Sequence, residues 1–246
     1  MIVLSLRIFL VLIELECNLC YTVKRIIYLG EIMNKKYIFF DFDGTLVDTS
    51  AGIFDSVKYA YKKMGLPFEN VEFRKFIGPP LEWSFMNISG FNKEDAAFAT
   101  ESFRENYREK GVFMHTIYKD VKNMLEALKN KGKVLAVATS KPEKFAKQIL
   151  AEYDLEKYFD FVSGATFDGS RSSKKDVLKY AISKINPDSL NNCVLVGDTK
   201  NDVFGAKEVG MDCIGILYGF GSKQELKEAG AVLTLENPLD VVMQIN

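Results

Sequence analysis

The chain has 246 residues, of which 48% are hydrophobic and 26% are charged, and its formal net charge is -1. These proportions are typical of an ordinary globular protein that is long enough to bury a full core. A net charge so close to zero gives no electrostatic basis for binding a nucleic acid polymer or an anionic membrane surface, because such partners usually require a basic field. We therefore expect a small-molecule partner, with no nucleic acid and no membrane.

The four cysteines indicate a reducing compartment. Cys17, Cys20, Cys193 and Cys213 lie in apolar or strand-like contexts and lack the spacing of a disulfide framework. We therefore expect a cytoplasmic protein, as a monomer or a homodimer. Cys17 and Cys20 form a C-x-x-C pair, but no second pair or histidine cluster completes a zinc site, so we expect no metal there.

Residues 1–33 do not match the rest of the chain. Met1 to Ile13 is almost continuously apolar. No basic region precedes this run, Arg7 interrupts it and no small-residue cleavage site follows, so neither a secretory signal nor a membrane segment fits. Gly30-Glu31 requires purine-rich codons, of the kind that bacterial ribosomes bind, just ahead of Met33. We expect residues 1–33 to be an N-terminal extension that is not native ahead of Met33, where translation would start.

The first predicted element of the core is a strand at Tyr37–Phe40, a run of aromatic and β-branched residues typical of a strand buried on both faces. Strand alternation places Asp41 and Asp43 on the same side directly after it. Gly44 permits a sharp turn, and Thr45 offers a hydroxyl and a backbone N–H. Two carboxylates this close favour a bound cation, whereas the alternative is a turn with solvated acids.

A long helical region follows this strand. Ala51 to Met64 has the three- and four-residue spacing of an amphipathic helix, and a similar pattern extends from Phe73 to Lys110. No β-rich run occurs until after His115. This much helix exceeds a simple crossover and predicts a helical cap over residues 51–116, inserted into a core formed by residues 34–50 and 117–246.

From Tyr118 onward, strands and helices alternate. The predicted elements are helices at Val121–Asn130 and Lys174–Ile185, a helix that starts at Pro142, and strands at Val134–Ala138, Phe161–Gly164, Cys193–Val196, Ile214–Leu217 and Val232–Leu233. This rhythm predicts an α/β fold with a doubly wound parallel sheet. The ends of the central strands converge on one crevice in such a fold, so Asp41, Thr139 and Asp198 should meet there.

The residues expected at this crevice share an affinity for a hard cation and for phosphate. They are the acids Asp41, Asp43, Asp198 and Asp202, the hydroxyls Thr139 and Ser140, and the cation Lys174. Oxygen ligands without cysteine or histidine favour Mg²⁺, which needs few protein ligands when a substrate phosphate supplies another. The hydroxyls and the ammonium group would then bind phosphate oxygens.

Simpler interpretations of these residues stay open. Thr139 and Ser140 could cap a helix, and Asp202 could complement the dipole of a helix in its first turn. Lys174 could belong to a solvated basic run from Arg171 to Lys175.

The sequence resembles the haloacid dehalogenase superfamily, in the branch with an inserted helical cap, and is similar to phosphoglycolate phosphatases. Four motifs carry the resemblance: Asp41-Phe42-Asp43-Gly44-Thr45, the strand-end Thr139, a lysine assigned to Lys174 with Lys175 as the rival, and Gly197-Asp198-Thr199-Lys200-Asn201-Asp202. The resemblance extends from Lys35 to Asn246, and residues 1–32 have no counterpart in it.

The resemblance implies a phosphatase acting on a small phosphorylated metabolite. Asp41 would attack phosphorus to form an aspartyl-phosphate, and Asp43 would transfer protons to the leaving group and from water. Asp41, the backbone carbonyl of Asp43, Asp198 and Asp202 would hold Mg²⁺. Thr139, Lys174 and the N–H groups near Gly44 would bind the phosphoryl group.

The substrate is less well defined by the sequence. Gly78 and Pro79 should reach over the site from the cap and bind substrate together with Gly44, Thr45 and Ser140. No arginine occurs in the Gly78 loop, which disfavours phosphoglycolate, and Asp168-Gly169-Ser170-Arg171 looks more like a nucleotidase-type subgroup. We expect Trp83 to fill the core of the cap, with stacking on a base or sugar as the alternative.

Two other functions remain possible on the same fold. A sugar-phosphate mutase of this branch would hold a basic gate residue on the first cap helix, where this chain has Ala51-Gly52-Ile53-Phe54. A non-catalytic phosphate-binding module would not need the acid–base carboxyl of Asp43. In either case the cap should close over the site, with hinges near Val47–Ser50 and His115–Tyr118.

Overall fold

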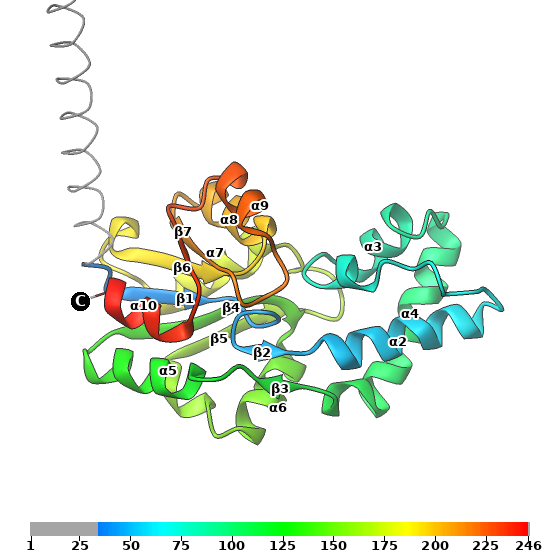
Figure 1. The fold of residues 1–246 in the computed structure, drawn as a ribbon, viewed down its shortest axis with the longest axis horizontal. Helices are drawn as coiled ribbons and strands as arrows, with labels where there is room; N and C mark the ends of the chain where they lie inside the picture. The colour runs from blue at the N-terminus through cyan, green and yellow to red at the C-terminus, as the bar shows by residue number, and fades with distance from the viewer. Residues whose placement is uncertain (1–33, 246) are drawn as a thin grey trace, which may run out of the picture.

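The computed structural model describes residues 34–245, which form an α/β core with an inserted group of helices (Figure 1). All neighbours in its six-stranded sheet pair in parallel. In spatial order the strands are β5 (Phe161–Ala165), β4 (Val134–Pro142), β1 (Tyr37–Phe40), β6 (Cys193–Gly197), β7 (Asp212–Ile216) and β8 (Leu233–Leu235). The predicted doubly wound fold is confirmed. The predicted N-terminal extension and the Cys17–Cys20 pair lie outside the described residues.

Helices cover both faces of the sheet (Figure 1). The core helices are α5 (Val121–Asn130), α6 (Glu143–Glu152), α7 (Lys174–Ile185), α8 (Lys200–Glu208), α9 (Lys223–Ala229) and α10 (Pro238–Gln244). Short 3₁₀ helices occur at Phe73–Phe76, Gly111–Phe113, Glu156–Tyr158 and Leu190–Asn192. Between residues 34 and 245, no helix combines the length and the apolar character needed to cross a membrane.

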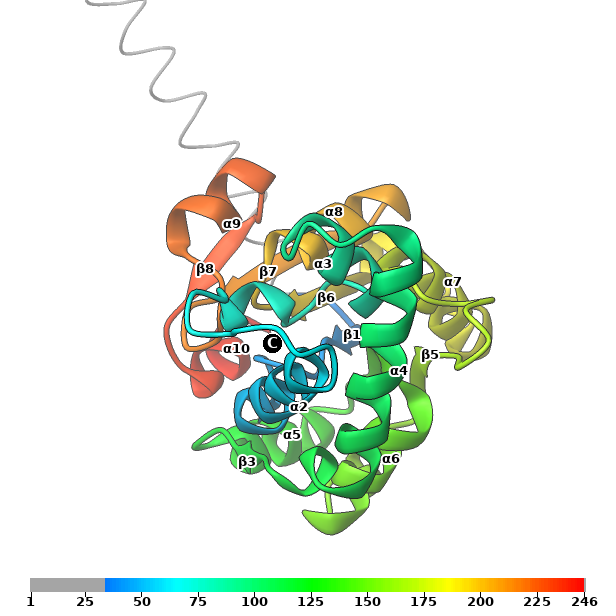
Figure 2. The ribbon, with the colours of Figure 1, turned by 90° about the vertical axis from the view of Figure 1, so that its right-hand side faces the viewer.

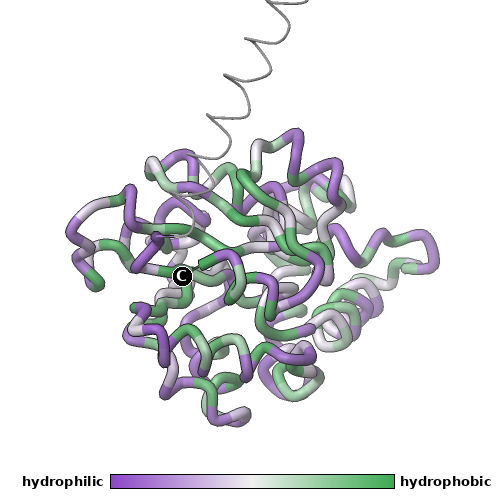
Figure 3. The backbone as a smooth tube through the Cα atoms, turned by 60° about the vertical axis from the view of Figure 1, so that its left-hand side comes forward, coloured by the Kyte–Doolittle hydropathy of each residue, from purple (hydrophilic) through white to green (hydrophobic). Residues whose placement is uncertain are grey.

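The central strand β1 contributes to two hydrophobic cores because its side chains alternate between the faces of the sheet. Ile38 and Phe40 pack in the core that also contains buried residues of α5, α6 and α10. Tyr37 and Phe39 pack in the core formed with α7, α8 and α9. Figure 3 shows hydrophobic stretches running through the middle of the molecule, with hydrophilic stretches at many of its outer loops. Burial on both faces explains why the strand sequence is a continuous apolar run.

Most predicted elements are present, with shifted ends. β4 continues through Pro142, with a register shift in its pairing to β5 between Ala138 and Pro142, so α6 starts one residue after the predicted position. β8 begins at Leu233 rather than at Val232. The sequence analysis predicts neither α9 nor α10, because seven-residue helices span too few turns to give a clear periodicity.

The inserted helices are α2 (Ser50–Lys63), α3 (Leu81–Asn87) and α4 (Lys93–Glu109), which lie in front of one end of the sheet in Figure 2. The chain enters and leaves this cap through two short antiparallel strands, β2 (Val47–Asp48) and β3 (Thr116–Ile117). The two crossings lie where the hinges are expected. Their pairing was not predicted, because a two-residue strand gives no periodic signal.

Trp83 does not fill the core of the cap, which corrects the expectation from the sequence. Its side chain is 51% exposed. The buried residues of the short helix α3 are Ser84 and Phe85, and the ring of Phe85 packs against Phe76 and Phe91. One helix of two turns can bury only one face, and Phe85 occupies that face.

Replacing Phe39 by alanine should destabilise the fold strongly. Phe39 is fully buried in the sheet, so Phe39→Ala should lower the free energy of unfolding by about 3–5 kcal/mol, measured by urea denaturation. The control Phe98→Ala removes a half-exposed ring on α4 and should change that free energy by less than about 0.5 kcal/mol. Equal effects of the two substitutions would contradict the packing described.

Candidate active site

The acids predicted at the strand ends meet where the order of the strands reverses. From β1 the chain continues to β4 and β5 on one side of the sheet, and it then returns to β6, β7 and β8 on the other side. Asp41 follows β1 and Asp198 follows β6, and these strands are neighbours in register, with Phe40 opposite Val196. Such a switch point, at the carboxyl ends of parallel strands, is the usual ligand site of a doubly wound fold.

Three buried carboxylates form a cluster at this position. Asp41, Asp198 and Asp202 each offer one oxygen atom, and these atoms all lie within 4.8 Å of one another. Burial raises the pKa of the Asp41 carboxyl to about 7, with Asp202 acting in the same direction and Lys174 opposing both. Burial, together with Asp202 and Asp41, raises the pKa of Asp198 well above its ordinary value. The surroundings within the described residues therefore do not fully compensate for the charge of these carboxyl groups when they are ionised.

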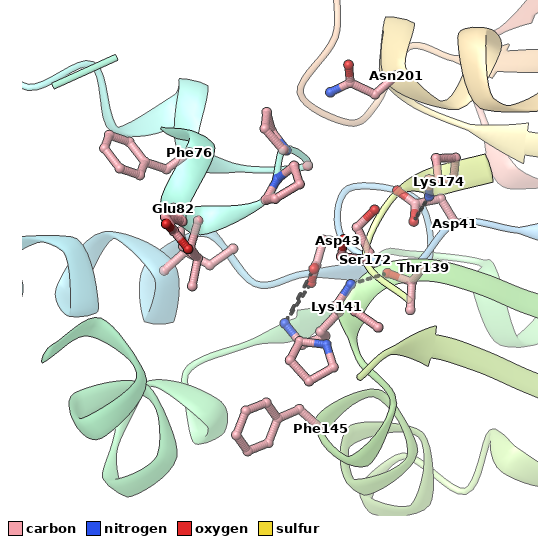
Figure 4. A pocket seen from close by; sticks show the side chains of 18 of the residues that line it. Asp41, Asp43, Phe76, Glu82, Thr139, Lys141, Phe145, Ser172, Lys174 and Asn201 are labelled. Carbon is pink, nitrogen blue, oxygen red and sulfur yellow. Dashed lines mark hydrogen bonds and ion pairs between the residues drawn. The ribbon is translucent and has the colours of Figure 1, made fainter. Parts of the chain in front are cut away.

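Lys174 contacts two of the three carboxylates. Its Nζ atom lies 2.5 Å from Asp41 Oδ1 (Figure 4). The same atom lies 2.8 Å from Asp202 Oδ1 and donates a hydrogen bond to the carbonyl of Ala138 at 3.0 Å. Burial lowers the pKa of Lys174, but the two carboxylates outweigh burial and hold this pKa above its ordinary value. Lys174 is the first residue of α7, so the start of this helix delivers the ammonium group to the ends of the strands.

The rival lysine lies elsewhere. The Lys175 side chain is 38% exposed, and its Nζ atom lies 3.6 Å from Glu208. The interior of α8 also makes room for Lys174, because a Cβ atom at Gly205 would collide with the Cβ and Cγ atoms of Lys174. Of the two candidates, the structure brings Lys174 to the acids and leaves Lys175 at the surface. The solvated basic run considered for Lys174 is therefore wrong.

The carboxylate cluster fits a hard divalent cation. Asp198 Oδ2 accepts a hydrogen bond from the backbone N–H of Phe220 at 2.8 Å, whereas Asp198 Oδ1 is buried and has no hydrogen-bond partner among the described residues. A buried carboxylate oxygen without a partner is costly, and a cation would satisfy it. Oxygen ligands from carboxylates are those that Mg²⁺ prefers.

Gly44 brings the first motif against this cluster. Its φ angle is +88°, and a Cβ atom there would collide with the carboxylate of Asp198. Thr45 is buried, and its Oγ1 atom has no hydrogen-bond partner within the described part of the chain. Gly44 therefore lies beside the cluster, whereas neither Gly44 nor Thr45 lines the cavity, and their binding of substrate stays a prediction.

Asp202 has two roles in the structure. Its Oδ2 atom accepts hydrogen bonds from the backbone N–H and the hydroxyl of Thr199, at 2.9 and 2.8 Å, in a capping box at the start of α8. Its Oδ1 atom faces Lys174. The capping role and the site role therefore coexist, because each uses a different carboxylate oxygen.

Asp43 points to a different set of partners. Its Oδ1 atom accepts hydrogen bonds from Thr49 Oγ1 at 2.5 Å and from Lys141 Nζ at 3.0 Å. The sequence analysis missed both partners. Lys141 lies two positions after the predicted site residue Thr139 and lines the same cavity, but the predicted strand ends at Ala138, so strand alternation gives no signal for it.

Thr139 and Ser140 do not cap a helix, so that alternative is wrong. The residue at the N-cap of α6 is Pro142. Thr139 Oγ1 instead accepts a hydrogen bond from the backbone N–H of Lys141 at 3.1 Å, within β4. Both hydroxyl residues line the cavity next to Asp41.

A cavity of about 390 Å³ lies over these residues, between the core and the cap. Figure 4 shows Asp41, Asp43, Thr139 and Lys174 on its core side, with Phe76 and Glu82 on its cap side. The predicted residues in its lining are Asp41, Asp43, Gly78, Pro79, Thr139, Ser140, Lys174 and Asp202. A Cβ atom at Gly78 would lie 3.7 Å from the Asn201 side chain, so the cap loop reaches across to the start of α8.

The rest of the lining is largely apolar and aromatic, and the sequence analysis did not predict it. The aromatic members are Phe76, Phe103, Tyr107, Phe145 and Phe167. Arg104 of α4 also lines the cavity, so the cap does supply a cation, although not from the Gly78 loop. Loop residues Thr166 and Ser172 complete the wall next to Lys174.

Comparison with known proteins finds several that are similar to this chain over most of its length. The chain is 36% identical to a 5'-nucleotidase of Pseudomonas aeruginosa over 191 residues. This aligned region covers 77% of this chain and 86% of that protein. It is 30% identical to a phosphoglycolate phosphatase of Vibrio vulnificus, over 85% of this chain and 96% of that protein. The crystal structure of a predicted phosphatase from Clostridium acetobutylicum superimposes with a TM-score of 0.82 at 39% identity, covering 85% and 97% of the two chains.

A match to one protein family covers most of the chain. Residues 38–216 match the family described as "Haloacid dehalogenase-like hydrolase", and this range includes β1, the cap, Lys174 and the acids that follow β6. The chain therefore belongs to the haloacid dehalogenase-like hydrolases.

Proposed function

We propose that this protein is a Mg²⁺-dependent phosphatase that hydrolyses a small phosphomonoester through an aspartyl-phosphate on Asp41. One observation carries the proposal. Asp41 lies at the floor of the cavity, with Lys174 on one of its oxygens and with two further buried carboxylates beside it. A nucleophilic carboxylate, a phosphate-binding cation and a metal cluster are the components that phosphoryl transfer requires.

In the first step, an oxygen of Asp41 forms a bond to phosphorus while the bond from phosphorus to the leaving oxygen breaks. Asp43 donates a proton to that oxygen. In the second step, Asp43 takes a proton from water, which attacks phosphorus and releases phosphate and the free Asp41 carboxylate. Lys174 and the Thr139 hydroxyl bind the oxygens of the transferring group, and the aromatic walls exclude bulk water.

Mg²⁺ would be held by Asp41, Asp198 and Asp202 with the backbone carbonyl of Asp43. When bound, it supplies positive charge that neutralises the phosphoryl oxygens. Using the carbonyl of Asp43 leaves its carboxyl group free to carry a proton. The separate partners of that carboxyl, Thr49 and Lys141, support this division of roles.

A nucleotide-like substrate is favoured by the cavity. Its volume of about 390 Å³ is within the range that holds a ligand larger than a two-carbon acid. The aromatic side chains Phe145 and Phe167, whose rings contact each other edge to face, offer stacking surfaces for a base. The relationship to a 5'-nucleotidase agrees with this choice.

Phosphoglycolate is the second candidate, and Arg104 is the observation that favours it. An arginine in the lining can bind a substrate carboxylate through two hydrogen bonds. The mutase alternative gains no such support, because the residue of α2 in the lining is Ile53 rather than a basic gate residue.

Asp41→Asn should abolish turnover while preserving the fold. The amide has the size of the carboxylate but cannot attack phosphorus. Phosphate release from p-nitrophenyl phosphate with Mg²⁺ measures the activity, and thermal unfolding checks the fold. A folded variant with substantial remaining activity would rule out the covalent scheme.

Lys174→Met should lower kcat/KM by about 10²–10³-fold, which is the usual loss when one donor to the transition-state oxyanion is removed. The matched control is Lys175→Met, which changes the exposed neighbour and should leave the rate near the wild-type value. The same assay with p-nitrophenyl phosphate applies. A larger loss in the control would reverse the assignment of the two lysines.

A panel of phosphate esters should identify the substrate class. We expect Mg²⁺-dependent phosphate release to be fastest with a nucleoside monophosphate, when compared with phosphoglycolate, sugar phosphates and pyrophosphate. Addition of EDTA should remove the activity, and excess Mg²⁺ should restore it. A preference for phosphoglycolate would favour the second candidate. Binding of phosphate without hydrolysis of any ester would instead indicate a non-catalytic module.

A further inference from the structure

Lys141 is a buried cation that the proposed mechanism does not use. Its side chain is only 4% exposed, although it lines the cavity. Burying an ammonium group is costly unless an anion and hydrogen bonds compensate for the lost water. The compensating anion is Asp43, whose two carboxylate oxygens lie 3.0 and 3.4 Å from Lys141 Nζ.

The surroundings keep this ammonium group charged. Burial lowers the pKa of Lys141, but Asp43 outweighs this effect and holds the pKa above its ordinary value. The Nζ atom also lies 4.8 Å from the ring centre of Tyr107 and 5.9 Å from that of Phe42. Aromatic faces attract a cation. Lys141 is therefore held between the acid–base carboxyl and two rings, one from the core and one from the cap.

We propose that Lys141 is a positioning residue that holds the Asp43 carboxyl toward the leaving group. The inference rests on the proposed phosphatase function. Thr49 and Lys141 both make their shortest contact with Asp43 Oδ1. The two donors come from different parts of the fold, because Thr49 precedes α2 and Lys141 lies on β4. Two donors on Oδ1 fix the rotation of the carboxyl, whereas Oδ2 has only the longer 3.4 Å contact with Lys141 and is the oxygen that transfers the proton.

Direct binding of the phosphoryl group by Lys141 is the competing interpretation. The geometry favours positioning, because Lys174 already contacts the nucleophile Asp41, whereas the carboxylate that Lys141 contacts is Asp43. The two lysines approach from different elements, α7 and β4. Each therefore serves one carboxylate of the first motif.

Tyr107 connects this arrangement to the cap. It is a buried residue of α4. Its ring packs against the ammonium group of Lys141, which in turn contacts Asp43. The packing of the cap on the core thus supports the orientation of the Asp43 carboxyl through two successive contacts, from Tyr107 to Lys141 and from Lys141 to Asp43.

The test compares Lys141→Met with Lys144→Met, a matched change of an exposed lysine three residues later. The measurement is kcat/KM with p-nitrophenyl phosphate and with the best alkyl phosphate of the ester panel. An alkoxide needs a proton in order to leave, whereas nitrophenolate does not. We expect Lys141→Met to lower kcat/KM by about 10²-fold for the alkyl ester and by less than about tenfold for the aryl ester, because misplaced acid catalysis affects the basic leaving group.

Competitive inhibition by inorganic phosphate and thermal unfolding complete the test. The inhibition constant should stay at the wild-type value, because Lys174 and Thr139 remain in place. Thr49→Val removes the other donor to Asp43 Oδ1, so it should also lower kcat/KM more for the alkyl ester than for the aryl ester, by a smaller factor. This variant replaces Lys141→Met in the test if Lys141→Met does not fold.

Three outcomes would overturn the inference. Equal losses for the two esters would contradict a role in proton transfer, and a parallel rise in the inhibition constant for phosphate would make Lys141 a phosphate ligand. If Lys141→Met has the same kcat/KM values as Lys144→Met, Lys141 has no role in the reaction. In each of these cases the wild-type protein is active, so the proposed function stands. A wild-type protein inert toward every ester would instead overturn the proposed function and the inference with it.

Discussion

The repulsion among buried carboxylates at the ends of β1 and β6 is the constraint on which the rest of the site depends. Asp41, Asp198 and Asp202 are buried so close together that they cannot all be ionised without positive charge between them. Lys174 provides part of this charge, and removing one partner of a buried ion pair typically costs about 3–5 kcal/mol. The start of α7 and the side-chain-free Gly205 both serve to admit this lysine. A divalent cation would supply the remainder.

The first motif divides its two acids between two environments. Asp41 belongs to the fully buried cluster with Lys174, whereas Asp43 faces Thr49 and Lys141 at the edge of the cavity. Because the two carboxylates have different cations, each can be arranged for a different task. The first suits a nucleophile next to a metal, and the second suits proton exchange with a leaving group and with water.

Sequence reasoning predicts the parts of this structure that repeat a local pattern. Continuous apolar runs identify β1 and β6, and the acids directly after them identify the crevice, because parallel strands end at the same edge of a sheet. The partners of Asp43 are harder to predict. Lys141 becomes significant only when β4 extends past Ala138 and brings it opposite Asp43, and Arg104 and Tyr107 reach the cavity only through the docking of α4. Such contacts depend on tertiary packing, which no periodicity encodes.

The paired strands β2 and β3 have a consequence for how this protein family can diversify. Because Val47 lies opposite Ile117, the chain leaves the core and returns to it at adjacent points. For the folding of the sheet, the whole segment between these two residues acts as one long loop whose ends are held together by β2 and β3. The free energy of closing a loop rises only slowly with its length, so helices can be added, lost or exchanged there at little expense to the folding of the core. Substrate preference can therefore evolve in the insertion while the bond-breaking chemistry stays fixed beneath it.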